Sequence, residues 1–101
     1  MFKAMILLKR KEGATLAEFA EWWLQQHRPL AEKLPGLKQA IFNMIDEETA
    51  GNYDGVSELW FEDRKAFVQA YESDIGQEVA ADSLANVSGR ERMFVTEHII
   101  K

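Results

Sequence analysis

The stretch TLAEFAEWWLQQHRPLAEKL, residues 15–34, sets the architecture of this chain. Its large apolar residues recur at helical spacing, and they are Leu16, Phe19, Trp23, Leu30 and Leu34. This period predicts an amphipathic helix with one apolar stripe. His27 falls on that stripe, four residues after Trp23. Because imidazole titrates close to neutral pH, His27 is either a satisfied core residue or an acid or base at a pocket.

Two features mark the start of this helix and a disturbance inside it. Thr15 and Glu18 form a capping box, in which each side chain accepts a hydrogen bond from the other residue's backbone amide. Pro29 lies within the helix, where it lacks an amide proton and costs ~3 kcal/mol. We therefore expect a kink or break near residues 26–28, beside His27. A break would also free a backbone carbonyl to accept a hydrogen bond near the imidazole.

The rest of the chain alternates between strand-like and helix-like segments. Residues 2–9 are apolar on both parities, which is typical of a strand buried on both faces. Other segments complete the order β-α-β-β-α-β: strands at 37–45, 56–61 and 92–100, helices at 64–71 and 75–85, and a polar loop at 46–55. Right-handed crossovers place both helical layers on one face of a four-stranded antiparallel sheet. The predicted fold class is α+β, a ferredoxin-like βαββαβ plait, in a single domain over residues 1–101.

The second face of this sheet has no helix to cover it. The strands at 2–9, 37–45 and 56–61 offer bulky apolar side chains to both faces. A chain of 101 residues has nothing left to cover that face. We therefore expect a homodimer that packs sheet against sheet and closes a dimeric α+β barrel, with the helices outside.

Composition narrows the possible partners. Hydrophobic residues make up 47% of the chain and charged residues 29%, as in a globular protein. A net charge of −5 argues against nucleic acid or an anionic membrane as a partner. The apolar run at residues 4–8 is too short for a signal-peptide core or a membrane span, so a cytoplasmic location is expected. The chain has no cysteine, hence no disulfide and no thiol nucleophile.

Several motifs together resemble the EthD family, which is named after ethyl tert-butyl ether degradation. The motifs are Phe19-xx-Trp22-Trp23-xxx-His27-x-Pro29, Leu34-Pro35-Gly36-Leu37, Tyr53-Asp54-Gly55-Val56-Ser57-Glu58-Leu59-Trp60-Phe61 and Ala81-Asp82. The resemblance implies the dimeric α+β barrel superfamily, in agreement with the architecture above. Relatives of known activity include bacterial methylmuconolactone isomerases and fungal polyketide-processing dehydratases or decarboxylases. Some relatives carry a tyrosine or another polar group on strand two, where this chain has Ala40 and Ile41.

This resemblance favours a functional role for His27. We predict that His27 is catalytic, as the general acid or base of a small cofactor-independent enzyme. Its substrate would be a small oxygenated cyclic or aromatic catabolite, held between helices and sheet and isomerised, dehydrated or decarboxylated. The predicted substrate-binding residues are Phe19, Trp23, Leu59, Phe61 and Asp82. For Asp82 the default interpretation is a solvated or capping carboxylate, and the alternative is that it orients the histidine or a substrate hydroxyl.

Two other titratable residues have simpler explanations. Ser57 and Leu59 fit the helix-facing side of their strand, which leaves Glu58 on the dimer face with a lysine or arginine partner. The alternative for Glu58 is a carboxyl with a raised pKa in the pocket. We interpret His98 as structural. No spacing of His, Asp and Glu favours a metal site and no glycine-rich loop favours a nucleotide, so neither metal nor cofactor is expected.

Two other functions stay open from the sequence. The first possibility follows from other members of the superfamily, which carry out oxygen chemistry. In that case the chain would be a monooxygenase, a reductase-type enzyme or a haem-binding protein, with His27 as axial ligand or activator. The second possibility is a non-catalytic accessory protein, which holds a hydrophobic metabolite for an ether- or aromatic-degrading oxygenase.

Overall fold

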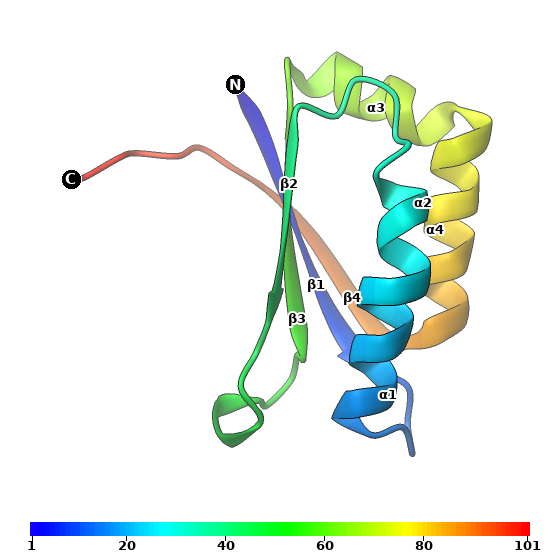
Figure 1. The fold of residues 1–101 in the computed structure, drawn as a ribbon. Helices are drawn as coiled ribbons and strands as arrows, with labels where there is room; N and C mark the ends of the chain where they lie inside the picture. Colours follow the sequence, from blue (N-terminus) through cyan, green and yellow to red (C-terminus); the bar gives the residue numbers. More distant parts are fainter.

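A computed structural model describes residues 1–101 as one four-stranded antiparallel sheet with helices on one face (Figure 1). The strands are β1 (Phe2–Arg10), β2 (Gln39–Met44), β3 (Gly55–Phe61) and β4 (Val87–Val95), in the order β2-β3-β1-β4. The helices are α1 (Leu16–Glu21), the π-helix η1 (Trp22–His27), α2 (Arg28–Ala31), the 3₁₀-helix η2 (Glu47–Thr49), α3 (Arg64–Glu72) and α4 (Asp74–Asn86). The predicted α+β, ferredoxin-like fold is confirmed.

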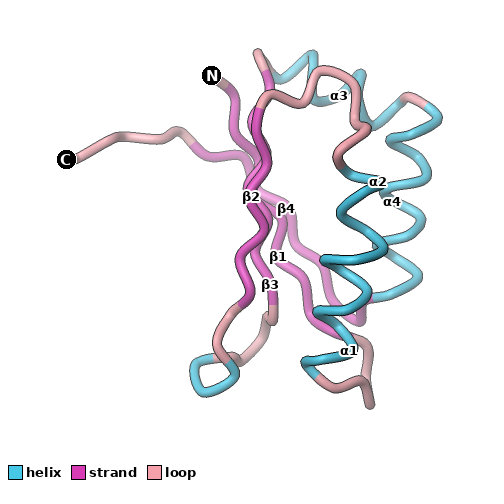
Figure 2. The backbone as a smooth tube through the Cα atoms, in the orientation of Figure 1, coloured by secondary structure: helices cyan, strands magenta, loops and turns pink.

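The helix-facing side of the sheet carries the core. Ala4, Ile6 and Leu8 on β1 are buried there. They pair in register with Leu59, Ser57 and the start of β3, so alternate residues of both strands face the helices. The helices form two layers, the first made of α1, η1 and α2 and the second of α3 and α4. Figure 2 shows both layers on that side of the sheet. The predicted parity of Ser57 and Leu59 is therefore confirmed, and Glu58 lies on the opposite face.

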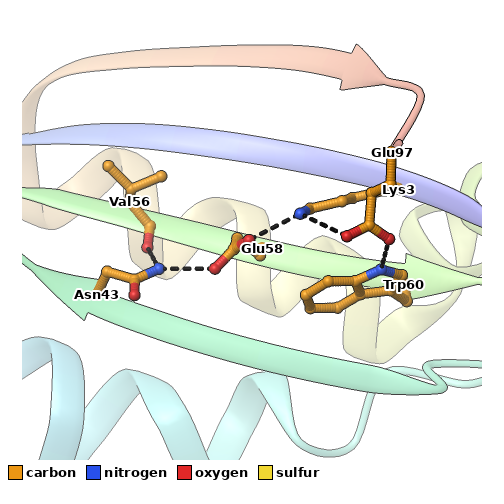
Figure 3. A network of polar contacts seen from close by, with 6 residues as sticks. All are labelled: Lys3, Asn43, Val56, Glu58, Trp60 and Glu97. Atoms are coloured by element: carbon orange, nitrogen blue, oxygen red, sulfur yellow. Dashed lines mark hydrogen bonds and ion pairs between the residues drawn. The ribbon is translucent and has the colours of Figure 1, made fainter. Parts of the chain in front are cut away.

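The opposite face of the sheet is uncovered and holds one polar network (Figure 3). Lys3 on β1 donates to Glu58 at 2.7 Å, and Asn43 on β2 donates to the other oxygen of Glu58 at 2.9 Å. Glu97 accepts from both Lys3 and the indole of Trp60. The bond from Lys3, followed by that from Asn43, lowers the pKa of Glu58. The alternative of a pocket carboxyl with a raised pKa is therefore wrong.

The first helical layer is continuous, but its middle third is a π-helix. The capping box forms as predicted, with the Glu18 amide 3.0 Å from the Thr15 hydroxyl and the Thr15 amide 2.8 Å from the Glu18 carboxylate. The amide of Arg28 bonds to the carbonyl of Trp23, five residues back. Pro29 follows directly in α2, and as a proline it donates no backbone hydrogen bond to the preceding turn. The expected kink or break at 26–28 is thus a widening of the helix that begins earlier, at Trp22.

The π-helix changes which side chains face inward. Residues five apart come into line in this helix, because its hydrogen bonds span five residues. Trp22 and His27 are such a pair, and their ring centroids lie 4.9 Å apart. Trp22, Trp23 and His27 are all buried. A period of 3.6 residues does not place Trp22 on the apolar stripe, which is why the stripe read from the sequence omits it.

The last strand begins earlier than predicted. β4 starts at Val87 rather than at residue 92, because residues 89–91 continue the pairing with β1 in the same register and Val87 pairs with Arg10 beyond a register shift. Residues 96–101 leave the sheet, and after Glu97, which still bonds to Lys3 and Trp60, the chain extends away from the body of the molecule (Figure 1). His98 lies in this exposed tail and not in a strand. None of the helices has the length and the apolar character that crossing a membrane requires.

Gly55 is a position where the packing of the first helical layer on β3 allows no side chain. A Cβ there would lie 2.6 Å from the Trp23 ring and 3.1 Å from the Phe19 ring. Both rings are buried, so either could shift only if neighbouring side chains moved as well. We expect Gly55→Ala to lower the free energy of unfolding by about 1–3 kcal/mol through overpacking, as measured by urea unfolding.

Gly51 supplies the control for this measurement. A Cβ on Gly51 meets nothing within 4 Å. Gly51→Ala should therefore change stability by less than about 0.5 kcal/mol. Equal stability of the two variants would contradict the packing described here.

Candidate functional site

His27 is held from behind by a carboxylate on the second helical layer. It is 5% exposed and lies at the end of η1. Its Nδ1 is 2.8 Å from Oδ2 of Asp82 on α4. The same oxygen accepts from the indole nitrogen of Trp22 at 3.1 Å, and Asn86 donates to the other oxygen at 3.3 Å. Three donors therefore fix the carboxylate, and the carboxylate fixes the ring.

This contact replaces the backbone carbonyl that the sequence suggested as the partner of His27. It also decides between the two interpretations of Asp82. The default of a solvated or capping carboxylate is wrong, because Asp82 contacts the histidine directly. Asp82 lies behind the imidazole and does not line the cavity described below.

The contact also sets the tautomer of the imidazole. An ionised carboxylate only accepts hydrogen bonds, so the proton of the neutral ring sits on Nδ1. Nε2 forms no hydrogen bond within the chain. Burial lowers the pKa of His27 below its ordinary value of 6.5, Asp82 opposes this shift, and the positive charge of Arg90 adds to it. At neutral pH His27 is therefore a neutral imidazole with a free basic nitrogen.

A small cavity lies between the helices and the sheet beside this imidazole. Its lining consists mainly of core side chains: Ile6, Leu8, Trp23, His27, Ala31, Phe42, Ser57, Leu59, Tyr71, Val79, Ser83 and Arg90. The cavity volume is about 20 Å³, which is room for about one water molecule. A ring-sized molecule would fit only after side chains move.

Phe42 and Ala31 lie between this cavity and a wider groove. Both residues also line an outer groove of about 350 Å³ between α2 and the edge strand β2. The Phe42 ring stacks on Trp23, with centroids 4.5 Å apart and an interplanar angle of 7°. It lies 6.3 Å from the His27 ring. Phe42, on the edge strand β2, is thus the one aromatic side chain that lines both the cavity and the groove.

The structure places three of the predicted site residues together at the cavity. His27, Trp23 and Leu59 line it. Phe19 and Phe61 are buried but lie outside the lining, Phe19 against Trp23 and Phe61 against Phe67.

Sequence reasoning missed several polar residues of the lining. They are Ser57, Tyr71, Ser83 and Arg90. Ser57 was recognised as helix-facing, so its parity could have identified it. Arg90 fell between the predicted helix at 75–85 and the predicted strand at 92–100, because that strand was predicted to begin five residues too late. The alternation of Arg90, Arg92 and Phe94 was the available signal.

No group of three or more His, Asp or Glu side chains converges anywhere in the structure. His27 and Asp82 form the tightest pair of such groups at the cavity. The chemistry that these two residues can supply directly is proton transfer through Nε2.

Comparison with known proteins identifies relatives at the level of family and fold. The EthD domain family model matches residues 11–90. An EthD family protein from Bacillus halodurans has a TM-score of 0.81 at 23% identity, covering 97% of this chain and 100% of that one. A dimeric ferredoxin-like protein of unknown function from Thermobifida fusca has a TM-score of 0.77 at 17% identity, covering 95% of this chain and 90% of that one.

A third solved structure is SnoaB, a cofactor-independent oxygenase from Streptomyces nogalater. Its TM-score is 0.71 at 15% identity, covering 97% of this chain and 93% of that one. No curated protein sequence matches the chain. At these identities the solved structures establish the fold.

The buried imidazole should have a measurable titration. We expect an NMR titration of the ring protons to give His27 a pKa below 6.5, because burial disfavours its charged form. Asp82→Asn should lower this pKa further, since it removes the negative charge that favours the imidazolium. A His27 pKa at or above 6.5, or one unchanged in Asp82→Asn, would contradict the site geometry.

Proposed function

The chain belongs to the EthD family, and we propose that it is a small enzyme with His27 as its general acid or base. Its substrate is a small oxygenated cyclic or aromatic compound that binds beside the imidazole. One observation carries this proposal: Asp82 occupies Nδ1, while Nε2 forms no hydrogen bond within the chain and His27 lines a cavity. Nε2 is therefore available to a molecule bound in that cavity.

The proposed chemistry is a proton transfer within the substrate. Neutral His27 accepts a proton at Nε2 from an acidic carbon or hydroxyl, and Asp82 stabilises the imidazolium that forms. The imidazolium then returns the proton to another atom of the substrate. Isomerisation, dehydration and decarboxylation each use such a step, and the histidine needs no cofactor to perform it. A positioned base of this kind is worth about 10²–10⁴ in rate.

The substrate enters from the outer groove between α2 and β2. The cavity of about 20 Å³ is too small for a ring. Rotation of the Phe42 side chain would join it to the groove of about 350 Å³, which shares Phe42 and Ala31 with it. Phe42 is half-buried and lies on an edge strand, so its ring has freedom that Trp23 lacks.

A cofactor-independent oxygenase is the second candidate. The description of SnoaB, which shares the fold, favours it. His27 would then remove the proton from a phenol or enol, and molecular oxygen would be the co-substrate. Oxygen consumption distinguishes this reaction from the first, because isomerisation, dehydration and decarboxylation consume none.

We also propose that the protein is a homodimer through the uncovered sheet face. That face carries Met5, Leu7 and Val56 half-buried, and Ile41 and Met93 at 39% and 40% exposed. The Lys3–Glu58 ion pair lies in its middle and is already satisfied within one subunit (Figure 3). The apolar side chains around this ion pair suit contact with a second copy of the same face, and Glu91 on the edge strand β4 accepts a hydrogen bond from the Tyr53 hydroxyl. The dimeric state of the Thermobifida fusca protein supports this assembly.

Replacing the proposed base should abolish turnover. We would incubate the protein with cyclic enols, lactones and phenolic or β-keto acids in D₂O. ¹H NMR would then follow deuterium exchange and product formation. For any compound that reacts, His27→Gln should lower kcat by about 10²–10⁴. His98→Gln is the matched control, because His98 lies in the exposed tail.

Full activity in a folded His27→Gln variant would overturn the assignment of the base. Oxygen uptake by the wild type that disappears in His27→Gln would select the oxygenase. Stabilisation by a ligand without turnover would instead indicate the accessory binding protein.

A charge on the uncovered face should separate the subunits. We expect Ile41→Asp to sediment as a monomer at micromolar concentration while the wild type sediments as a dimer, because a buried unpaired carboxylate is costly. Val68→Asp is the control, because Val68 is 42% exposed, close to the 39% of Ile41, and lies on helix α3. A monomeric wild type, or a dimeric Ile41→Asp, would contradict the proposed interface.

A further inference from the structure

The cavity beside His27 contains a second charged group that the proposed proton transfer does not use. Arg90 lies on β4 opposite Leu8 of β1, and both residues line the cavity. Its guanidinium therefore shares the cavity with the imidazole, on the sheet side rather than the helix side.

Arg90 has no partner within the chain. Its Nε is buried and forms no hydrogen bond. The carboxylates within 4 Å of a basic side chain pair with Lys3, Lys9, Arg10, His27 and Arg28, and none of them pairs with Arg90. An unpaired cation at such a site is costly, because desolvation is not offset by a counter-charge. The fold gives no reason to place an unpaired arginine at this position, so a role in ligand binding would account for it.

Nearby groups increase the local positive potential instead of neutralising it. Arg92 follows two residues later and stacks on the rings of Phe67 and Phe94, with its guanidinium carbon 5.5 and 5.0 Å from their centroids. Asp82 is the carboxylate of the site, but it is committed to His27, Trp22 and Asn86. The carboxylate of Asp82 therefore pairs with His27, and the guanidinium of Arg90 is available to bind a ligand.

Hydroxyl groups complete the polar part of the cavity. Tyr71, Ser57 and Ser83 line it together with Arg90. The Ser57 hydroxyl donates to the Ile6 carbonyl at 3.3 Å, which leaves its oxygen able to accept. Tyr71 and Ser83 form no side-chain hydrogen bond within the chain, so both can donate to a ligand oxygen.

We propose that Arg90 binds an anionic oxygen group of the substrate, so that the enzyme acts on small ring compounds that carry a carboxylate. This inference rests on the proposed function, and it narrows the substrate class of the same site. A guanidinium matches a carboxylate in charge and planar geometry. Arg90 then binds the substrate's carboxylate on the sheet side of the cavity, while His27 accepts a proton from a carbon or hydroxyl of the substrate on the helix side.

Carboxylate binding can be tested without knowing the reaction. The probes are acetate and benzoate, with benzamide as the neutral counterpart of benzoate. The readout is the shift of the His27 ring signals in NMR, together with the change in thermal unfolding temperature. We expect both acids to shift the His27 signals of the wild type and to stabilise it, and benzamide to do neither.

Three variants assign this binding to Arg90. Arg90→Gln should bind the acids about tenfold or more weakly, because a charged hydrogen-bond donor is lost. Arg90→Lys should bind with intermediate affinity, because it keeps the charge without the planar fork. Arg92→Gln is the control, because Arg92 lies on the same strand but outside the cavity lining. Arg90→Gln should unfold at the same or a higher temperature than the wild type, since no native partner is lost.

Unchanged acetate and benzoate affinity in Arg90→Gln would overturn the proposal. So would an equal loss in Arg92→Gln, equal binding of benzamide, or a wild type in which no acid shifts the His27 signals. His27→Gln, followed by unfolding temperature, should still bind the acids. Failure of His27 as a catalyst would therefore leave this result standing, and the two proposals fail separately.

Discussion

The hydrogen bond from His27 Nδ1 to Asp82 Oδ2, at 2.8 Å, is the constraint on which the site depends. It joins the first helical layer to α4 directly above the sheet. A desolvated imidazole needs an acceptor for its proton, and this carboxylate supplies one while Trp22 and Asn86 hold it in place. Since the proton is thereby confined to Nδ1, Nε2 is left as a base. Burial keeps the ring neutral at the pH where a base is useful.

The π-helix is what brings these groups to one place. An α-helix would carry Trp22 round to the edge of the apolar face, whereas the wider turn of η1 buries Trp22, Trp23 and His27 together. Such segments are frequent at functional sites, because they trade helix stability for side-chain placement. Gly55 on β3 completes the arrangement, since only a residue without a side chain fits under the Trp23 ring. Residues distant in sequence therefore act on a single imidazole.

Local patterns predicted most of the fold and part of the site. The alternation of Ser57, Leu59 and Phe61 gave the correct face of β3, and helical spacing placed Trp23 and His27 inside. The π-helix was not predictable from a 3.6-residue period, so the burial of Trp22 was missed. Arg90 was missed because Val87, Ser88 and Gly89 resemble a turn in sequence, while in the structure they extend β4. The contact between His27 and Asp82 spans 55 residues, and no local pattern specifies which carboxylate faces a given histidine.

The two faces of the sheet carry different polar groups. On the uncovered face Lys3 pairs with Glu58 and Glu97, whereas on the cavity face Nε of Arg90 is buried without a partner and Nε2 of His27 forms no hydrogen bond within the chain. The site depends on Nε2 of His27 being unprotonated at neutral pH, so that it can accept a proton. A two-bond ¹H–¹⁵N spectrum of the His27 ring at neutral pH tests it most directly. A protonated Nδ1 beside an unprotonated Nε2 is the result that the geometry requires. A proton on Nε2, whether in the other tautomer or in an imidazolium, would contradict it.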